Sequence, residues 1–191
     1  ITSLVRDIHD TPTIADIVVS GAGTSALSWL LSVPGASRTV LEAQVPYASR
    51  ALIDFLGHDP QQYVNVETAK AMAHVAYTRA VDLKTTDGPP IGLACTAAIA
   101  TDRPRRGSHR CHVALWTSSG TSTHTLVMAK GTRNRLEEEH LVGRLVLNVL
   151  GQACKVDRIP TLPIRSEEKV ASAYAEYDDP VEALINNHIK S

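Results

Sequence analysis

The chain has 191 residues, a mass of 20.6 kDa and a net charge of −1, from 19 basic and 20 acidic side chains. This balance provides no overall field that would attract nucleic acid or an anionic membrane. No apolar run reaches the roughly 18–20 residues that cross a bilayer. We therefore expect a soluble, intracellular protein of the cytoplasm or of an organelle matrix (mitochondrion or plastid), with no nucleic-acid binding and no membrane insertion.

Apolar periodicity in the first third of the chain predicts alternating helices and strands. Pro-Gly pairs and single prolines or glycines separate them. In chain order they are a helix at 2–9, a strand at 16–20, a helix at 24–33, an extended segment at 38–47 and a helix at 48–56.

The middle of the chain carries the most regular patterns. Asn65 is a good N-cap for a helix over Val66–Leu83, whose alanine-rich stripe suits close packing on a sheet. Pro90–Ala98 is small and apolar throughout, as expected of a central strand covered on both faces. A hairpin at 109–130 and a helix over Arg133–Ala153 complete the predicted domain. The order indicates an α/β protein, a three-layer α/β/α sandwich with a mixed, mostly parallel sheet.

The composition changes at Lys155 to proline and charged residues. We therefore expect a domain over residues 1–154 and a polar linker or tail over 155–191, with a further domain after it as one interpretation. Two weak helices are predicted in this tail, at Glu167–Tyr177 and Pro180–Ile189. Because the tail offers little apolar surface, we expect it to pack weakly on the domain.

The junction between the first strand and the next helix is the best candidate for a site. The strand ends at Ser20 and is followed by Gly21 and Gly23, after which the helix begins at Thr24. Backbone N–H groups and the positive end of a helix dipole are expected there, an arrangement that binds phosphates and carboxylates. We predict that Ser20 to Thr24 form a strand-to-helix turn whose N–H groups face an open pocket shared with Tyr47.

One interpretation of this junction is a dinucleotide-binding fingerprint. Residues 21–26 fit the pattern G-x-G-x-x-G/A, and Glu42 ends the next strand where a ribose-binding carboxylate belongs. This resembles the opening of NAD- or FAD-dependent oxidoreductases. Since the chain then shows no second nucleotide-binding half, this interpretation ranks below the next one.

A longer resemblance covers about Ile14 to Ala153 and consists of short motifs in a fixed order. Val19–Ala26 is similar to a family segment A-E-S-C-T-G-G, and Val33–Ser37 is similar to a turn written pGaS. The later motifs are similar to Y-S-N-x-x-K, A-x-x-M-A, T-G-I-A-G-P and G-D-R; here they stand at 47–57, 68–73, 93–100 and 131–133. Together they resemble the carboxy-terminal domain of the CinA family, which includes nicotinamide-nucleotide amidases. Some plant-type members place this domain before a nucleotidyltransferase-like domain.

The resemblance implies catalytic roles for Ser20 and Tyr47. In the amidases the serine attacks a carboxamide, a lysine removes its proton and the tyrosine assists. This chain keeps the tyrosine, but the lysine position holds Leu52, which cannot accept a proton. Two family glycines are replaced by Ala97 and Ala100, which adds methyl groups where the backbone should approach the ligand.

Five further residues are candidates for ligand binding, because N–H groups, hydroxyls and a guanidinium can hold a phosphate or ribose. They are Gly21, Gly23, Thr24, Thr96 and Arg133. The favoured hypothesis is a weakened or inactive amidase-like domain that binds a pyridine nucleotide and serves in regulation or assembly, with a protein partner or a second copy and with no cofactor. The alternatives are an active amidohydrolase on nicotinamide mononucleotide with Lys70 or His74 as a displaced base, and the oxidoreductase fragment above.

Two other clusters have simpler explanations. His109, Cys111 and His112 carry metal-ligating groups, but the first two face one side of a strand and the third faces the other, so no metal is expected. The basic run at 103–110, which comprises Arg103, Arg105, Arg106, His109 and Arg110, is typical of a solvated loop. The three cysteines, Cys95, Cys111 and Cys154, are widely spaced and suit buried thiols in a reducing compartment.

Overall fold

The computed structural model describes residues 1–103 and 106–177. Within these residues the strands form one sheet in the order β2-β1-β3-β4-β5-β6. Pairs β1–β2 and β1–β3 are parallel, whereas β3–β4, β4–β5 and β5–β6 are antiparallel, so β5 runs in the direction of β1, β2 and β3. The strands are β1 (Ile14–Ser20), β2 (Val40–Gln44), β3 (Pro90–Ala98), β4 (His109–Trp116), β5 (Gly120–Met128) and β6 (Lys169–Glu176).

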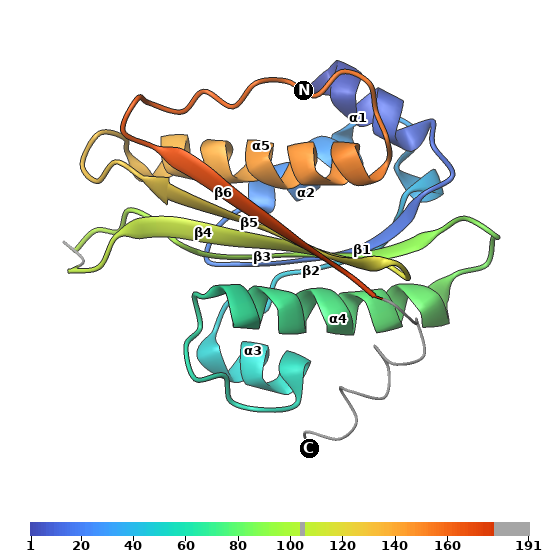
Figure 1. Ribbon diagram of the computed structural model, residues 1–191, viewed down its shortest axis with the longest axis horizontal. Coiled ribbons are helices and arrows are strands. Elements are labelled where there is room, and N and C mark those ends of the chain that lie inside the picture. Colours follow the sequence, from blue (N-terminus) through green and yellow to red (C-terminus); the bar gives the residue numbers. More distant parts are fainter. Residues whose placement is uncertain (104–105, 178–191) are drawn as a thin grey trace.

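Helices cover both faces of this mixed sheet, which confirms the predicted three-layer α/β/α class (Figure 1). One layer holds α1, α2 and α5, and the other holds α3 and α4. The bounds are α1 (Thr2–His9), α2 (Thr24–Ser32), α3 (Ser49–Leu56), α4 (Val66–Leu83) and α5 (Arg135–Ala153), with a short 3₁₀ turn at Ala36–Arg38.

The central strand β1 is buried along its whole length and contributes side chains to the core on each face of the sheet. Ile17 and Val19 point into the larger core with α1, α2 and α5, whereas Val18 points into the smaller core under α4. Gly92 on β3 allows α4 to lie close, because a Cβ there would come within 2.1 Å of the Ala73 carbonyl oxygen. The parallel pairing of β1 with β3 places the ends of both strands side by side, with Ser20 in register with Thr96.

The predicted helix at Glu167–Tyr177 is wrong, because residues 169–176 form β6 at the edge of the sheet. The small side chains of this segment fit either structure, and an isolated helix of this length is only marginally stable in water, whereas pairing with the edge of β5 stabilises the strand. The other predicted helix, Pro180–Ile189, lies outside the described residues.

The segment between α5 and β6 also packs more closely than predicted. Ile159 and Leu162 lie against the larger core, and the Asn148 side chain donates a hydrogen bond to the Pro160 carbonyl at 2.7 Å. Glu168 is buried. The prediction that residues beyond Lys155 pack weakly on the domain is therefore wrong for the described part of the tail. In residues 1–103 and 106–177 no helix combines the length and the apolarity that spanning a membrane requires.

Candidate functional site

The strand-to-helix turn after β1 is held close to β3 by a glycine. Gly21 has a φ of +85°, and a Cβ at this position would lie 2.0 Å from the Ala97 carbonyl oxygen. Both the left-handed backbone and the close approach require glycine here. Ser20 is thereby left at the end of its strand, on the face that carries α4.

A cavity of about 210 Å³ opens at this point. It brings together four of the residues that the sequence nominated, Ser20, Gly21, Tyr47 and Thr96, together with Leu52. The remaining lining comes from Ala48, Ser49, Tyr63, Val64 and Ala97. The predicted turn and the pocket shared with Tyr47 are therefore both confirmed.

The Ser20 hydroxyl has no base beside it in this cavity. Its Oγ donates to the Pro46 carbonyl oxygen at 3.0 Å, and that oxygen cannot take up the proton. Leu52, only 2 % exposed, occupies the position of the family lysine. Within the described lining the only side chains that titrate are the phenols of Tyr47 and Tyr63. The geometry offers hydrogen bonds to a ligand but no route for activating the serine.

Arg135, which the sequence analysis missed, supplies the positive charge at the mouth of the cavity. Its guanidinium donates to the Tyr47 hydroxyl at 3.2 Å, to the Gly21 carbonyl at 3.5 Å and to the Ala100 carbonyl at 2.7 Å. The one available signal was its place in the first turn of α5, where a cation is unfavourable to the helix dipole and therefore needs another explanation.

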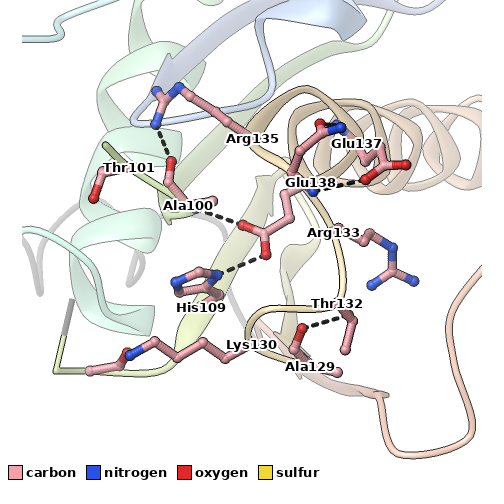
Figure 2. Close-up of polar contacts among 12 residues, drawn as sticks. Ala100, Thr101, His109, Ala129, Lys130, Thr132, Arg133, Arg135, Glu137 and Glu138 are labelled. Carbon is pink, nitrogen blue, oxygen red and sulfur yellow. Dashed lines mark hydrogen bonds and ion pairs between the residues drawn. The ribbon is translucent and has the colours of Figure 1, made fainter. Parts of the chain in front are cut away.

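A buried carboxylate holds this arginine in place from the other side of Ala100. Figure 2 shows Glu138 between Ala100 and His109: the Ala100 N–H donates to Glu138 at 2.7 Å, and His109 Nδ1 lies 2.7 Å from the other oxygen. Glu138 is fully buried. Arg135 donates to the carbonyl of the same alanine, so the hydrogen bond between Glu138 and the Ala100 N–H fixes the loop that Arg135 contacts.

The start of α2 is already occupied by a side chain of the protein itself. The Glu139 carboxylate accepts from the N–H groups of Gly23 and Ser25 at 2.9–3.0 Å and from the Thr24 hydroxyl at 2.9 Å. The prediction that these N–H groups face the open pocket is wrong for Gly23, because α5 brings an anion to the positive end of the helix. A ligand role for Gly23 or Thr24 therefore requires Glu139 to move.

Arg133 contacts the segment after α5 instead of the cavity. It pairs with Glu168 and donates to the Pro163 carbonyl at 3.1 Å. The hydrogen bonds that Arg133 donates to Glu168 raise the pKa of the guanidinium above its ordinary value. Among the described residues Arg133 makes its hydrogen bonds to Glu168 and Pro163, away from Ser20 and Tyr47, and a ligand role for it stays a prediction.

The two displaced bases considered for an active enzyme lie elsewhere. Lys70 pairs with Glu67 at 3.3 Å, and His74 packs its ring on Trp116 at 4.6 Å. Both line a separate groove along α4, whose described lining excludes Ser20. Glu42, the candidate ribose ligand, is held by Arg79 at 2.8 Å. The antiparallel half of the sheet also replaces the second parallel half that a dinucleotide fold needs.

The strand of His109 and His112 has the expected geometry. His109 reaches Glu138 under α5, whereas His112 Nδ1 lies 2.9 Å from the Thr125 hydroxyl on the other face. No group of three metal-ligating side chains with suitable geometry occurs within residues 1–103 and 106–177.

Part of the basic run forms a second cavity beside the first. Arg106 and Arg110 line a space of about 580 Å³ that shares Tyr63 and Val64 with the Ser20 cavity. Arg110 is steadied by a hydrogen bond to the Val64 carbonyl at 3.1 Å. Arg105 lies outside the described residues.

The sequence matches no protein-family model and no curated protein, but the fold has clear counterparts among solved structures. The competence/damage-inducible protein CihA of Agrobacterium tumefaciens has a TM-score of 0.58 and 20% identity, over 81% of this chain and 91% of that one. CinA-superfamily proteins of Escherichia coli (TM-score 0.61, 17% identity, 81% and 90% covered) and Enterobacter cloacae (0.63, 14%, 80% and 91%) are similar. The chain therefore has a CinA-like fold, in agreement with the resemblance of its motifs, and the plant-type arrangement stays a prediction.

Proposed function

We propose that this CinA-like domain binds a pyridine mononucleotide at the Ser20 cavity, does not hydrolyse its amide at a useful rate, and acts as a regulatory or assembly domain. The observation that carries the proposal is a polar cavity with a guanidinium bound to the Tyr47 hydroxyl at its mouth, next to a serine that lacks a base.

The loss of activity follows from proton transfer. A serine hydroxyl attacks an amide only when a neighbouring group takes its proton, and such assistance typically supplies about 10²–10⁴-fold in rate. Ser20 directs its hydroxyl to the Pro46 carbonyl, and Leu52 fills the place of the base. Arg135 cannot substitute, because a guanidinium stays protonated in proteins.

The binding role is supported by the polar groups that remain. Tyr47 and Thr96 line the cavity. The Thr96 hydroxyl donates to the Tyr63 carbonyl at 2.6 Å, so it is left as an acceptor, and Arg135 adds a fixed positive charge at the mouth of the cavity. The adjoining cavity of Arg106 and Arg110 continues the positive surface past Tyr63. An anionic group such as a phosphate is the natural complement of these guanidinium groups.

Calorimetric titration with nicotinamide mononucleotide tests binding. We expect saturable binding to the wild type, weakened about tenfold in Arg135→Ala, which removes a charged contact of roughly 1.5 kcal/mol. Arg6→Ala, an exposed change on α1, is the matched control and should bind as the wild type does. No heat from wild type at any ligand concentration would contradict the proposal.

Ammonia release from the same nucleotide tests the chemistry. Wild type and Ser20→Ala should be equally slow. In Leu52→Lys, with folding checked by circular dichroism, release should rise by about 10²-fold if the missing base is the cause. Rapid release by wild type that disappears in Ser20→Ala would establish the active amidohydrolase instead.

A further inference from the structure

The two edges of the sheet differ in how they are protected. β2 has five residues, its pairing with β1 shifts register at Ala15/Asp16, it carries Glu42 and Pro46 follows it closely. A short strand, a shift of register, a charge and a nearby proline all disfavour the pairing of another strand with this edge. β6 has eight residues in unbroken register with β5, no proline and no bulge. In Figure 1 it lies in front of the other strands, at the open side of the sheet.

The backbone groups that β6 leaves unpaired can be assigned from one hydrogen bond. The Tyr177 N–H donates to the Ser119 carbonyl at 3.1 Å, which continues the β5–β6 ladder by one residue. Since successive residues of a strand direct their N–H and C=O groups to opposite edges, Val170, Ser172, Tyr174 and Glu176 direct theirs away from β5. The first three form the centre of an edge whose backbone groups are available to a further strand.

We infer that β6 pairs antiparallel with β6 of a second copy of this chain, about a two-fold axis that is perpendicular to the sheet and passes midway between the two Ser172 residues. This register places Val170 opposite Tyr174 of the second copy and Ala171 opposite Ala173. Val170, Ser172 and Tyr174 then meet outward residues of the second copy, so their ladder hydrogen bonds find partners. Tyr174, 62 % exposed, gains a β-branched neighbour, which is a favourable cross-strand pair.

The charged residues of the strand lie at its ends, outside the centre of this arrangement. Lys169 begins β6 and Glu176 ends it. In the register above Lys169 lies opposite Ala175 of the second copy, and its side chain and that of Glu176 lie on opposite faces of the sheet, so the arrangement rests on the backbone hydrogen bonds and on the Val170–Tyr174 pairs. The small side chains between these ends, at Ala171, Ser172 and Ala173, leave the backbone open to a second strand.

Sedimentation of this 191-residue chain over a wide range of concentrations tests the pairing of two β6 strands. We expect the mass to rise from 20.6 kDa towards twice that value as concentration increases. Ser172→Pro removes an outward N–H and should weaken association by about tenfold or more, since edge strands tolerate proline there while the partner loses its hydrogen bond. Ser172→Ala keeps the N–H and is the matched control, which should associate as the wild type does.

Circular dichroism and thermal unfolding show whether Ser172→Pro stays folded. If it does not, Tyr174→Lys decides the matter, because it adds a charge at the edge without removing a backbone donor, and it should again favour the monomer. A wild type that stays monomeric throughout, or a dimer that persists in the folded edge variants, would overturn the inference.

Discussion

Asp16 is the least compensated polar side chain in the described structure. It lies on β1 beneath α4, is fully buried, and neither carboxylate oxygen has a hydrogen-bond partner among the described residues. Burial, followed by repulsion from Glu42, raises the pKa of its carboxyl to about 7, although Arg79 acts in the opposite direction. The site therefore favours the protonated acid, in contrast to an ordinary surface carboxylate.

This carboxyl should make stability depend on pH in a defined window. Below about pH 4 it is protonated in both the folded and the unfolded chain, and its contribution to stability is fully present. As the pH rises from about 4 to 7, the unfolded chain ionises first, so stability falls; above the folded-state pKa the loss is constant. Asp16→Asn should remove this slope and raise the free energy of unfolding at pH 8 by about 1–3 kcal/mol.

Urea unfolding at several pH values measures the difference between variant and wild type. Asp7→Asn, a change to an exposed acid on α1, is the control and should leave the slope in this window unaltered. An Asp16→Asn protein with the wild-type slope would show that the buried carboxyl is solvated in the folded chain.

At the scale of the elements, Glu139 joins two helices that are distant in sequence. Its carboxylate on α5 satisfies the N–H groups of Gly23 and Ser25 and so completes the start of α2, which has no side-chain cap of its own. An anion at a helix N-terminus gains both hydrogen bonds and dipole energy. The same geometry that binds phosphate in other α/β proteins here stabilises the fold.

Removing this carboxylate should expose the anion site. Glu139→Ala is expected to lower the free energy of unfolding by about 2 kcal/mol, because three charge-assisted donors lose their acceptor. Inorganic sulfate should restore part of the loss, beyond the general stabilisation that sulfate gives the wild type. Glu67→Ala, which removes an exposed carboxylate paired with Lys70, is the control. A Glu139→Ala protein that gains no more from sulfate than the wild type does would contradict the assignment.

Local patterns predicted most elements correctly where one signal dominated. The helix Val66–Leu83 and the strand Pro90–Ala98 have the predicted bounds, because a side-chain cap and an unbroken apolar run define them. The strand at 169–176 was predicted wrongly, since its structure depends on β5, more than forty residues earlier. A pattern that is read locally cannot include such a partner.

The site shows the same division. Ser20, Gly21, Tyr47 and Thr96 were predicted and share one cavity. Arg133 was predicted because of its motif position, and Arg135 was not considered. Which of the two reaches the cavity depends on the distant Glu168, which binds Arg133.

At the scale of the whole molecule, Glu168 links the last described segment to the rest of the domain through hydrogen bonds and an ion pair. Its carboxylate accepts from the Ala129 N–H at 2.8 Å, the Arg165 N–H at 2.7 Å and the Arg133 guanidinium. Burial alone would raise the pKa of this carboxyl, but the hydrogen bonds from Arg133, Arg165 and Ala129 lower it to about 2. One residue thus joins the end of β5, the loop before α5 and the start of β6.

Loss of this carboxylate should release the edge of the sheet. In Glu168→Gln, Arg133 keeps its charge without a charged partner, and breaking such a buried pair costs about 3–5 kcal/mol. Because the folded-state pKa is depressed, the stabilisation is fully present above about pH 4.5 and is lost as the pH falls towards about 2. Hydrogen exchange at neutral pH should show faster exchange in β6 and in residues 156–168, with α4 protected. Glu167→Gln, an exposed neighbour, is the control. If β6 in Glu168→Gln exchanged as slowly as in the wild type, its pairing with β5 would be sufficient to hold the edge without the buried ion pair.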